Sequence, residues 1–198
     1  MNHFLKRYIV KIPKNIDVFY CDERQILLVN GPFGKKILKL GIKLELLQDE
    51  NVIRVLDSTF KKVSNKDKKT VKSLRGTTVA LLKQAFLEVS TVICKKLKLV
   101  GVGFKAFPIE TKSYNLIHLK LGFSHSIYFK IPKAIDIKCH KTDKLFVSGN
   151  ILSQVAQTAA LIRSCKTPEP YKGKGVSYSN EIIKLKELTV RKFDGIVK

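Results

Sequence analysis

The sequence contains no tryptophan, a single methionine, and only 16 acidic residues against 38 lysines and arginines. It has no apolar run near the roughly 18 residues that a membrane-spanning helix needs, which excludes a span of that kind. Its four cysteines are scattered and form no C-x-x-C pair, so zinc ribbons and redox dithiols lack their spacing. We therefore expect reduced cysteines that pack as small hydrophobic residues, and no metal site.

Catalytic patterns are also lacking. No paired carboxylates, metal-ligand cluster or nucleophile–base spacing is present, and the histidines stand alone. Gly101, Gly103 and Ala106 match the dinucleotide fingerprint G-x-G-x-x-A, but Pro108 and alternating residues follow where that fingerprint requires a helix. A helix after Ala106 would favour a dinucleotide-dependent enzyme, whereas a strand would favour a binding protein without that activity. The sequence thus predicts no enzyme, no cofactor and no small-molecule substrate.

What the sequence has in excess is positive charge, +22 at neutral pH, together with a hydrophobic content of 44% that suffices for a folded core. Because self-repulsion of this charge destabilises a compact chain, we expect a polyanionic partner that neutralises it. Nucleic acid is the first candidate. The alternative is a peripheral module that binds another polyanion, such as an anionic membrane.

The hydrophobic pattern indicates short antiparallel strands from Tyr8 to Leu56, with Asn30-Gly31 as a strong turn signal. A helix with one apolar stripe is expected from about Val79 to Lys96. Arg75-Gly76, just before this expected helix start, would favour an anion through the helix dipole. The polar, cationic residues 61–72 predict a solvated loop or helix lead-in, or alternatively an arm that follows phosphates.

One segment recurs. Residues 12–18 are IPKNIDV and residues 131–137 are IPKAIDI, and each is followed by a polar gap, a short apolar strand and a glycine turn. This repeat predicts an α+β fold of two duplicated small domains, each an antiparallel β-sheet packed against one α-helix. The expected boundaries are 1–98 for the N-terminal domain, 99–180 for the C-terminal domain, and 181–198 for a basic tail with helical tendency near 182–188.

Residues 168–176, PEPYKGKGV, form the most distinctive stretch. Two prolines fix the backbone and remove two donors, so the run cannot lie inside a helix or a sheet. Two glycines flank Lys174 and would leave the backbone open to close approach, while Lys172 adds charge and Tyr171 a stacking ring. Such a rigid cationic loop suits a phosphate-rich partner. A surface loop rich in turn formers is the simpler alternative.

The same run resembles the C-terminal signature of the bacterial-type large-subunit ribosomal protein L six family, and the similarity covers almost the whole chain. It continues in the family's order at NGPFG (30–34), RGTT (75–78), LVGVGF (99–104) and LGFSH (121–125). The resemblance implies a structural, non-enzymatic constituent of the large ribosomal subunit that binds large-subunit rRNA near the sarcin–ricin and translation-factor region, beside neighbouring ribosomal proteins. By resemblance the rRNA-binding residues, all in or just before the C-terminal loop, are Tyr171, Lys172, Gly173, Lys174, Gly175 and Arg163.

The chain departs from the family pattern at Ser126, where the family usually has proline, and in a longer 108–115 turn, a lysine-rich 61–72 stretch and an extended tail. Lys, Asn and Ile are used freely and Trp is absent, as an AT-rich genome would produce. The first apolar pair, Ile9-Val10, follows Met1 so closely that we expect no cleavable presequence. We therefore expect a mitochondrial member, in the large subunit of the mitochondrial ribosome, with bacterial cytoplasm or plastid as alternatives.

Overall fold

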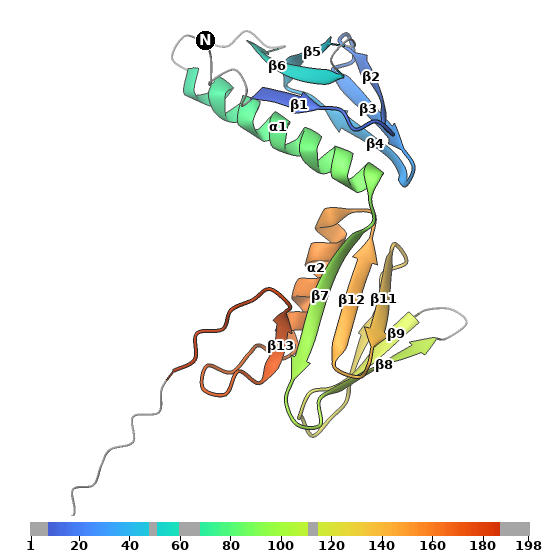
Figure 1. Cartoon of the computed structure of the whole chain (residues 1–198), viewed down its shortest axis with the longest axis vertical. Coiled ribbons are helices and arrows are strands. Elements are labelled where there is room, and N and C mark those ends of the chain that lie inside the picture. Colours follow the sequence, from blue (N-terminus) through green and yellow to red (C-terminus); the bar gives the residue numbers. More distant parts are fainter. Residues whose placement is uncertain (1–7, 48–50, 60–67, 111–114, 187–198) are drawn as a thin grey trace, which may run out of the picture. The chain divides into compact units, whose positions relative to one another are not determined.

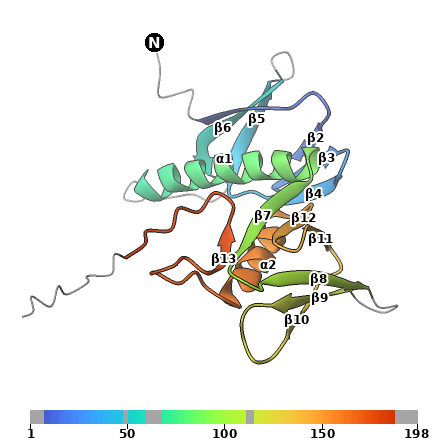
Figure 2. The ribbon, with the colours of Figure 1, turned by 60° about the horizontal axis from the view of Figure 1, so that its bottom comes forward.

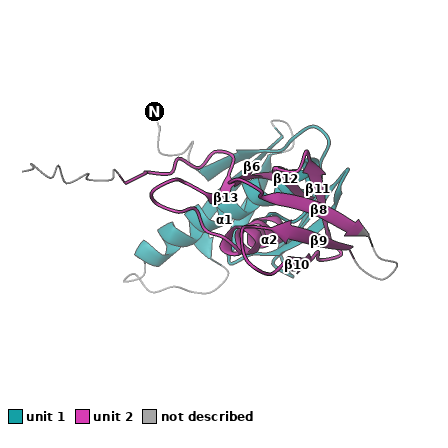
Figure 3. Ribbon diagram, turned by 90° about the horizontal axis from the view of Figure 1, so that it is seen from below, with its two compact units in different colours: residues 1–93, 150–152 teal, residues 94–149, 153–198 magenta. Residues whose placement is uncertain are grey.

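The computed structural model describes residues 8–47, 51–59, 68–110 and 115–186. Within these ranges the chain forms thirteen β-strands and two α-helices, which confirms the α+β class (Figure 1). The chain divides into two compact units: unit 1 is residues 1–93 with 150–152, and unit 2 is residues 94–149 with 153–198 (Figure 3). The domain boundaries expected at residues 98 and 180 stay a prediction.

Unit 1 holds two antiparallel three-stranded sheets. The first has the order β1-β6-β5, from Ile9–Lys11, Val52–Thr59 and Ile42–Leu47. The second has the order β2-β3-β4, from Asp17–Cys21, Ile26–Gly31 and Gly34–Lys39. A hairpin turn is present but lies at Pro32-Phe33, two residues later than the predicted Asn30-Gly31, because Asn30 and Gly31 end β3 and pair with Lys35 and Gly34 of β4.

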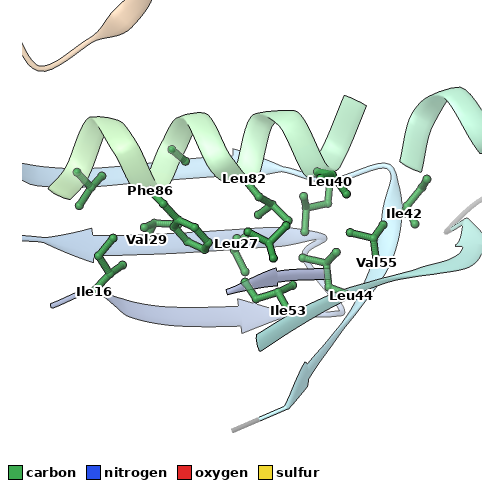
Figure 4. Close-up of a cluster of buried hydrophobic side chains, with 14 residues drawn as sticks. Ile16, Leu27, Val29, Leu40, Ile42, Leu44, Ile53, Val55, Leu82 and Phe86 are labelled. Atoms are coloured by element: carbon green, nitrogen blue, oxygen red, sulfur yellow. The ribbon is translucent and has the colours of Figure 1, made fainter. Parts of the chain in front are cut away.

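The helix α1, Lys68–Ser90, packs on these strands through one apolar stripe. Figure 4 shows Leu82 and Phe86 pointing from α1 toward Leu27 and Val29 of β3. All four side chains are at most 4% exposed. Burial of such side chains contributes about 1.5–3 kcal/mol each, so this layer contributes substantially to the stability of unit 1.

The predicted bounds of this helix were wrong at both ends. It begins at Lys68, so residues 75–76 lie inside it and not at an anion-binding N-terminus. Arg75 instead donates to the Val55 carbonyl oxygen (2.9 Å), pairs with Asp57, and stacks 3.8 Å from the Tyr8 ring centroid. The helix ends at Ser90, where the β-branched run 91–93 favours the next strand.

Unit 2 also has two sheets. One has the order β10-β9-β8, from Ile127–Lys130, Asn115–Lys120 and Lys105–Glu110. The other has the order β11-β12-β7-β13, from Ile135–His140, Lys144–Gly149, Ile93–Val100 and Gly175–Tyr178. The helix α2, Leu152–Ser164, buries Val155, Thr158, Ala159 and Ile162.

The glycines between β7 and β8 belong to a turn, and Ala106 lies in strand β8. A strand and not a helix therefore contains Ala106, which is evidence against a dinucleotide-binding turn at these glycines. Gly101 and Gly122 leave space for the Phe104 ring. A Cβ atom on Gly101 would lie 3.1 Å from that ring, and a Cβ atom on Gly122 would lie 2.9 Å from it.

The two units are duplicates, as predicted, but the IPK repeat does not mark equivalent positions. In each IPK segment a following isoleucine amide donates back to the proline carbonyl, Ile16 to Pro13 (3.2 Å) and Ile135 to Pro132 (3.0 Å). Matching β1 to β6 with β7 to β12 in chain order makes the sheets correspond, β1-β6-β5 to β7-β12-β11 and β2-β3-β4 to β8-β9-β10, and each helix then follows the sixth strand of its unit. The IPK segments precede β2 and β11, which are not equivalent strands in this match.

A buried carboxylate gives unit 1 a pH-dependent contact. Glu88 on α1, 4% exposed, pairs with Lys36 of β4 and accepts a 2.7 Å hydrogen bond from Gln84. Burial alone would raise the pKa of Glu88, but the bonds from Lys36 and Gln84 outweigh it and hold the pKa below its ordinary value. The unfolded chain therefore takes up this proton at a higher pH than the folded chain does.

We expect Glu88→Gln to lower the free energy of unfolding at neutral pH by about 2 kcal/mol, since a charge-assisted bond is lost. In the wild type this contribution is present at neutral pH and is lost as pH falls through the lowered pKa of Glu88. Urea unfolding as a function of pH measures both effects. The control is Glu45→Gln, which breaks the solvent-exposed pair with Arg54 and should cost at most about 1 kcal/mol. Equal costs would contradict the prediction.

Candidate nucleic-acid interface

The loop that joins α2 to β13 is closed by its own backbone. Val176 donates to the Lys166 carbonyl oxygen (2.8 Å), which fixes the base of the loop. Above it, the Glu169 amide donates to Lys174 O and the Gly173 amide to Glu169 O, both at 2.9 Å. The loop between Lys166 and Val176 is therefore a preorganised turn, as its two prolines predicted.

Gly173 and Gly175 do not leave the backbone open to a partner, contrary to the expectation from the sequence. Both are buried, and both have positive φ, +67° at Gly173 and +150° at Gly175. A Cβ atom on Gly175 would lie 2.7 Å from the Pro168 Cα and from the Thr167 carbonyl oxygen. The Gly173 amide already donates within the loop. These glycines therefore close the loop on itself, and the side chains of the neighbouring residues 171, 172 and 174 are exposed.

Those side chains are available to a partner. Tyr171 is 46% exposed, and Lys172 and Lys174 are exposed on either side of buried Gly173. Glu169 is the exposed acid of the loop, and its backbone rather than its carboxylate organises the turn. The loop thus presents two ammonium groups and one ring from a fixed backbone, which is suited to phosphate contact with stacking.

The segment that follows β13 returns to the loop. The Lys186 amide donates to the Pro170 carbonyl oxygen (2.9 Å), and a Cβ at Gly173 would lie 3.4 Å from a Leu185 methyl group. Residues 182–186 have no helical structure, so the helical tendency predicted there is wrong for them; residues 187 and 188 lie outside the described residues. This segment supports the loop from one side.

Arg163, the weaker predicted contact, is held inside the unit. Its Nε and Nη2 donate to the two carboxylate oxygens of Glu181, the first at 3.0 Å, and Glu181 also accepts from the Tyr178 amide (3.1 Å). The bond from Arg163 lowers the pKa of Glu181, and the same bond raises the pKa of Arg163. Arg163 therefore anchors the returning segment at its start.

One cationic contact was missed by the sequence reasoning. Lys166, at the base of the loop, lies with Nζ 4.2 Å from the Phe123 ring centroid, and Phe123 stacks on His125 at 5.4 Å. Phe123 and His125 come from the turn between β9 and β10, 43 and 41 residues earlier in the sequence, so nothing in the local pattern joins them to Lys166. The contact lies at the junction between the end of α2 and the start of the loop.

The wider surroundings of the loop remain basic. Residues 163–186 carry six basic and two acidic side chains. In the described part of the chain no group of three or more metal-ligating side chains occurs, and no helix there is long and apolar enough to cross a membrane. All four cysteines are free, as expected, but Cys21 and Cys94 are exposed rather than packed.

The duplicated α+β fold, the structured cationic loop and the net charge of +22 are together typical of a small basic ribosomal protein. Comparison with known proteins gives the family. The family model described as Ribosomal protein L6 matches residues 101–179. The chain belongs to this ribosomal protein L6 family, a structural, non-enzymatic family of the large ribosomal subunit.

Three relatives show the extent of the similarity. Large ribosomal subunit protein uL6 of Alkaliphilus oremlandii is 38% identical over 177 residues, 89% of this chain and 92% of that protein. The uL6 protein of Chloroherpeton thalassium is 39% identical over 178 residues, covering 90% and 92%. Large ribosomal subunit protein uL6m of Reclinomonas americana is 36% identical over 179 residues, covering 90% and 94%.

Gly175→Ala tests the closure of the loop. We expect it to lower the free energy of unfolding by about 2 kcal/mol or more, because the added methyl group meets backbone atoms at a strained φ. The matched control is Gly76→Ala, in the exposed part of α1 with no atom within 4 Å of the added Cβ. That change should stabilise by up to about 1 kcal/mol. Thermal or urea unfolding distinguishes the two, and a neutral Gly175→Ala would contradict the closed-loop geometry.

Glu181→Gln tests the anchor of the returning segment. Loss of the ion pair with Arg163 should speed tryptic cleavage at Lys184 and Lys186 about tenfold, because local opening of the segment becomes easier. In the wild type the folded-state pKa of Glu181 is lowered, so protection of the segment, followed by amide hydrogen exchange where trypsin is inactive, should be full at neutral pH and decline as pH falls through that pKa. Cleavage at Lys133, in the turn before β11, should not change, and a parallel rise there would indicate global destabilisation instead.

Proposed function

We propose that this chain is a structural constituent of the large ribosomal subunit that binds large-subunit rRNA through the loop 171–175, near the sarcin–ricin and translation-factor region. The observation that carries the proposal is the preorganised loop, with Lys172 and Lys174 exposed beside Tyr171. A loop fixed before binding loses little conformational entropy on contact with RNA.

The mechanism follows from the geometry. The two ammonium groups neutralise phosphates, and Tyr171 offers a face for stacking on an unpaired base. Because phosphate contacts position a protein without reading sequence, specificity comes from the shape of the folded RNA. The loop backbone serves as the rigid support of these side chains, since its Gly173 amide is already bonded internally.

Membership of the family implies neighbouring ribosomal proteins as further partners, and the chain needs no enzymatic activity, cofactor or small-molecule substrate for this role. We infer that it acts in the mitochondrial ribosome. The supporting observations are the AT-rich type of composition and the similarity to uL6m of Reclinomonas americana, whose name carries the mitochondrial suffix. Bacterial relatives are equally similar, so bacterial cytoplasm and plastid are the alternatives. Detection of the chain in purified mitochondria, with its gene in mitochondrial DNA, tests this placement.

The double variant Lys172→Ala with Lys174→Ala should weaken binding to large-subunit rRNA and make its salt dependence shallower. Two lost phosphate contacts reduce the slope of log K against log salt by up to about 1.8, at about 0.9 per contact. Filter binding over a series of salt concentrations measures this slope.

Two control proteins complete the experiment. Lys35→Ala with Lys39→Ala removes the same charge from exposed positions of β4 in unit 1 and should leave the slope nearly unchanged. Lys172→Arg with Lys174→Arg keeps the charge and should keep the slope. An unaltered slope in the loop variant would overturn the proposed contact, and binding to anionic vesicles without binding to rRNA would favour the membrane alternative.

A further inference from the structure

The sheet β10-β9-β8 of unit 2 carries a continuous row of rings on one face. Phe107, His118 and Tyr128 are register partners across the three strands, which Figure 2 shows as neighbours. The Phe107 and His118 rings stack at 6.1 Å with an interplanar angle of 26°, and the His118 and Tyr128 rings at 5.0 Å and 18°. We refer to these three residues as the aromatic rung.

The aromatic rung faces outward. Tyr128 is 61% and Phe107 38% exposed, whereas Ala106 and Ile117, on the opposite face of the same sheet, are at most 2% exposed and form core. The His118 Nε2 atom is covered and has no hydrogen-bond partner among the described residues, so stacking between its two neighbours holds this imidazole. The rung therefore does not serve the core, and its outer ring, Tyr128, is open to a partner.

The charge around the rung is positive. Lys105 and Lys120 are exposed register partners one rung away on the same face, since side chains alternate along a strand. Like charges directly opposite each other are destabilising unless an anion lies between them. Among the described positions of this face, alternate residues from 105 to 109, 116 to 120 and 128 to 130, none is acidic. An aromatic row beside uncompensated lysines complements a phosphate-bearing partner with flat bases.

We propose that the aromatic rung is a second RNA contact, at which an unpaired rRNA base stacks on Tyr128 while Lys105 and Lys120 lie near its phosphates. The inference rests on the proposed function, because it assumes that the partner is rRNA. Exposed aromatic side chains on the face of an open sheet are a common means of stacking unpaired bases. The contact is distinct from the loop 171–175, which would act mainly through phosphates.

The test compares full-length Tyr128→Ala and Tyr128→Phe for binding to an unstructured oligouridine of about twelve nucleotides and to large-subunit rRNA. Tyr128→Ala should lose roughly tenfold in affinity for oligouridine, with an unchanged salt slope because no charge is removed. Tyr128→Phe keeps the ring and should bind as the wild type does. The matched control is Phe19→Ala, which removes another exposed ring, 60% exposed, from a sheet in unit 1 and should have no effect.

The outcomes separate this inference from the proposed function. If Tyr128→Ala binds both RNAs as the wild type does while the Lys172 and Lys174 double variant binds weakly, the rung contact is overturned and the proposed function stands. If the wild type binds neither RNA, both fall. Normal RNA affinity combined with poor assembly of Tyr128→Ala into large subunits would overturn the inference in favour of a protein partner at this face.

A second measurement needs no variant. Ultraviolet crosslinking of the wild-type protein to oligouridine carrying 4-thiouridine, followed by mass spectrometry of the peptides, should yield a nucleotide adduct on Tyr128 or on its stacked neighbour His118. Adducts confined to other peptides would overturn the inference even if Tyr128→Ala fails to fold.

Discussion

At Gly175 the chain passes so close to the end of the preceding helix–loop connection that no side chain fits. A Cβ atom there would lie 2.7 Å from both Thr167 O and the Pro168 Cα. This close approach lets Val176 donate to Lys166 O and start β13 directly beside β7. The exposed lysines of the loop therefore derive their fixed positions from a backbone contact in which they take no part. Rigidity and charge come from different residues, and each can be changed without the other.

Several of the few acidic residues form ion pairs that join elements of the fold. Glu88, Asp57, Glu45 and Glu181 are each paired with a base within their own unit, and three of the four partners are arginines. Arginine suits such pairs because its planar fork can bond both carboxylate oxygens, as Arg163 does with Glu181. The acids thus serve to fasten elements together, which leaves most of the lysine charge uncompensated on the surface.

Patterns of period two and turn residues predicted the strands well, and the two prolines with two glycines correctly located the loop. Residues 75–78 misled the helix assignment because glycine followed by two threonines is typical of a helix start. Tertiary contacts of Arg75 with Val55 and Asp57 instead hold this segment in the middle of α1. A glycine in the sequence does not show whether the space beside it is filled by a partner or by the chain's own backbone. At Gly175 the backbone of Thr167 and Pro168 fills that space.

The aromatic rung could not be read from the sequence for a different reason. Its residues, at positions 107, 118 and 128, come from three strands, and only the register brings them into one row. A shift of one residue in either pairing would turn a ring toward the core.

A strand added to the duplicate explains why the loop exists in unit 2. Each unit runs through six strands and then into a helix, α1 after β6 and α2 after β12. In unit 1, β1 is an edge strand of the sheet β1-β6-β5, whereas the equivalent strand of unit 2, β7, has a further neighbour. After α2 the chain returns to add β13 along the outer edge of β7, which removes an unpaired edge. The connection from α2 to β13 has both ends fixed by secondary structure. A short loop between two fixed ends is where a chain can hold charged side chains in place at the least cost in entropy, and this is where Lys172 and Lys174 lie.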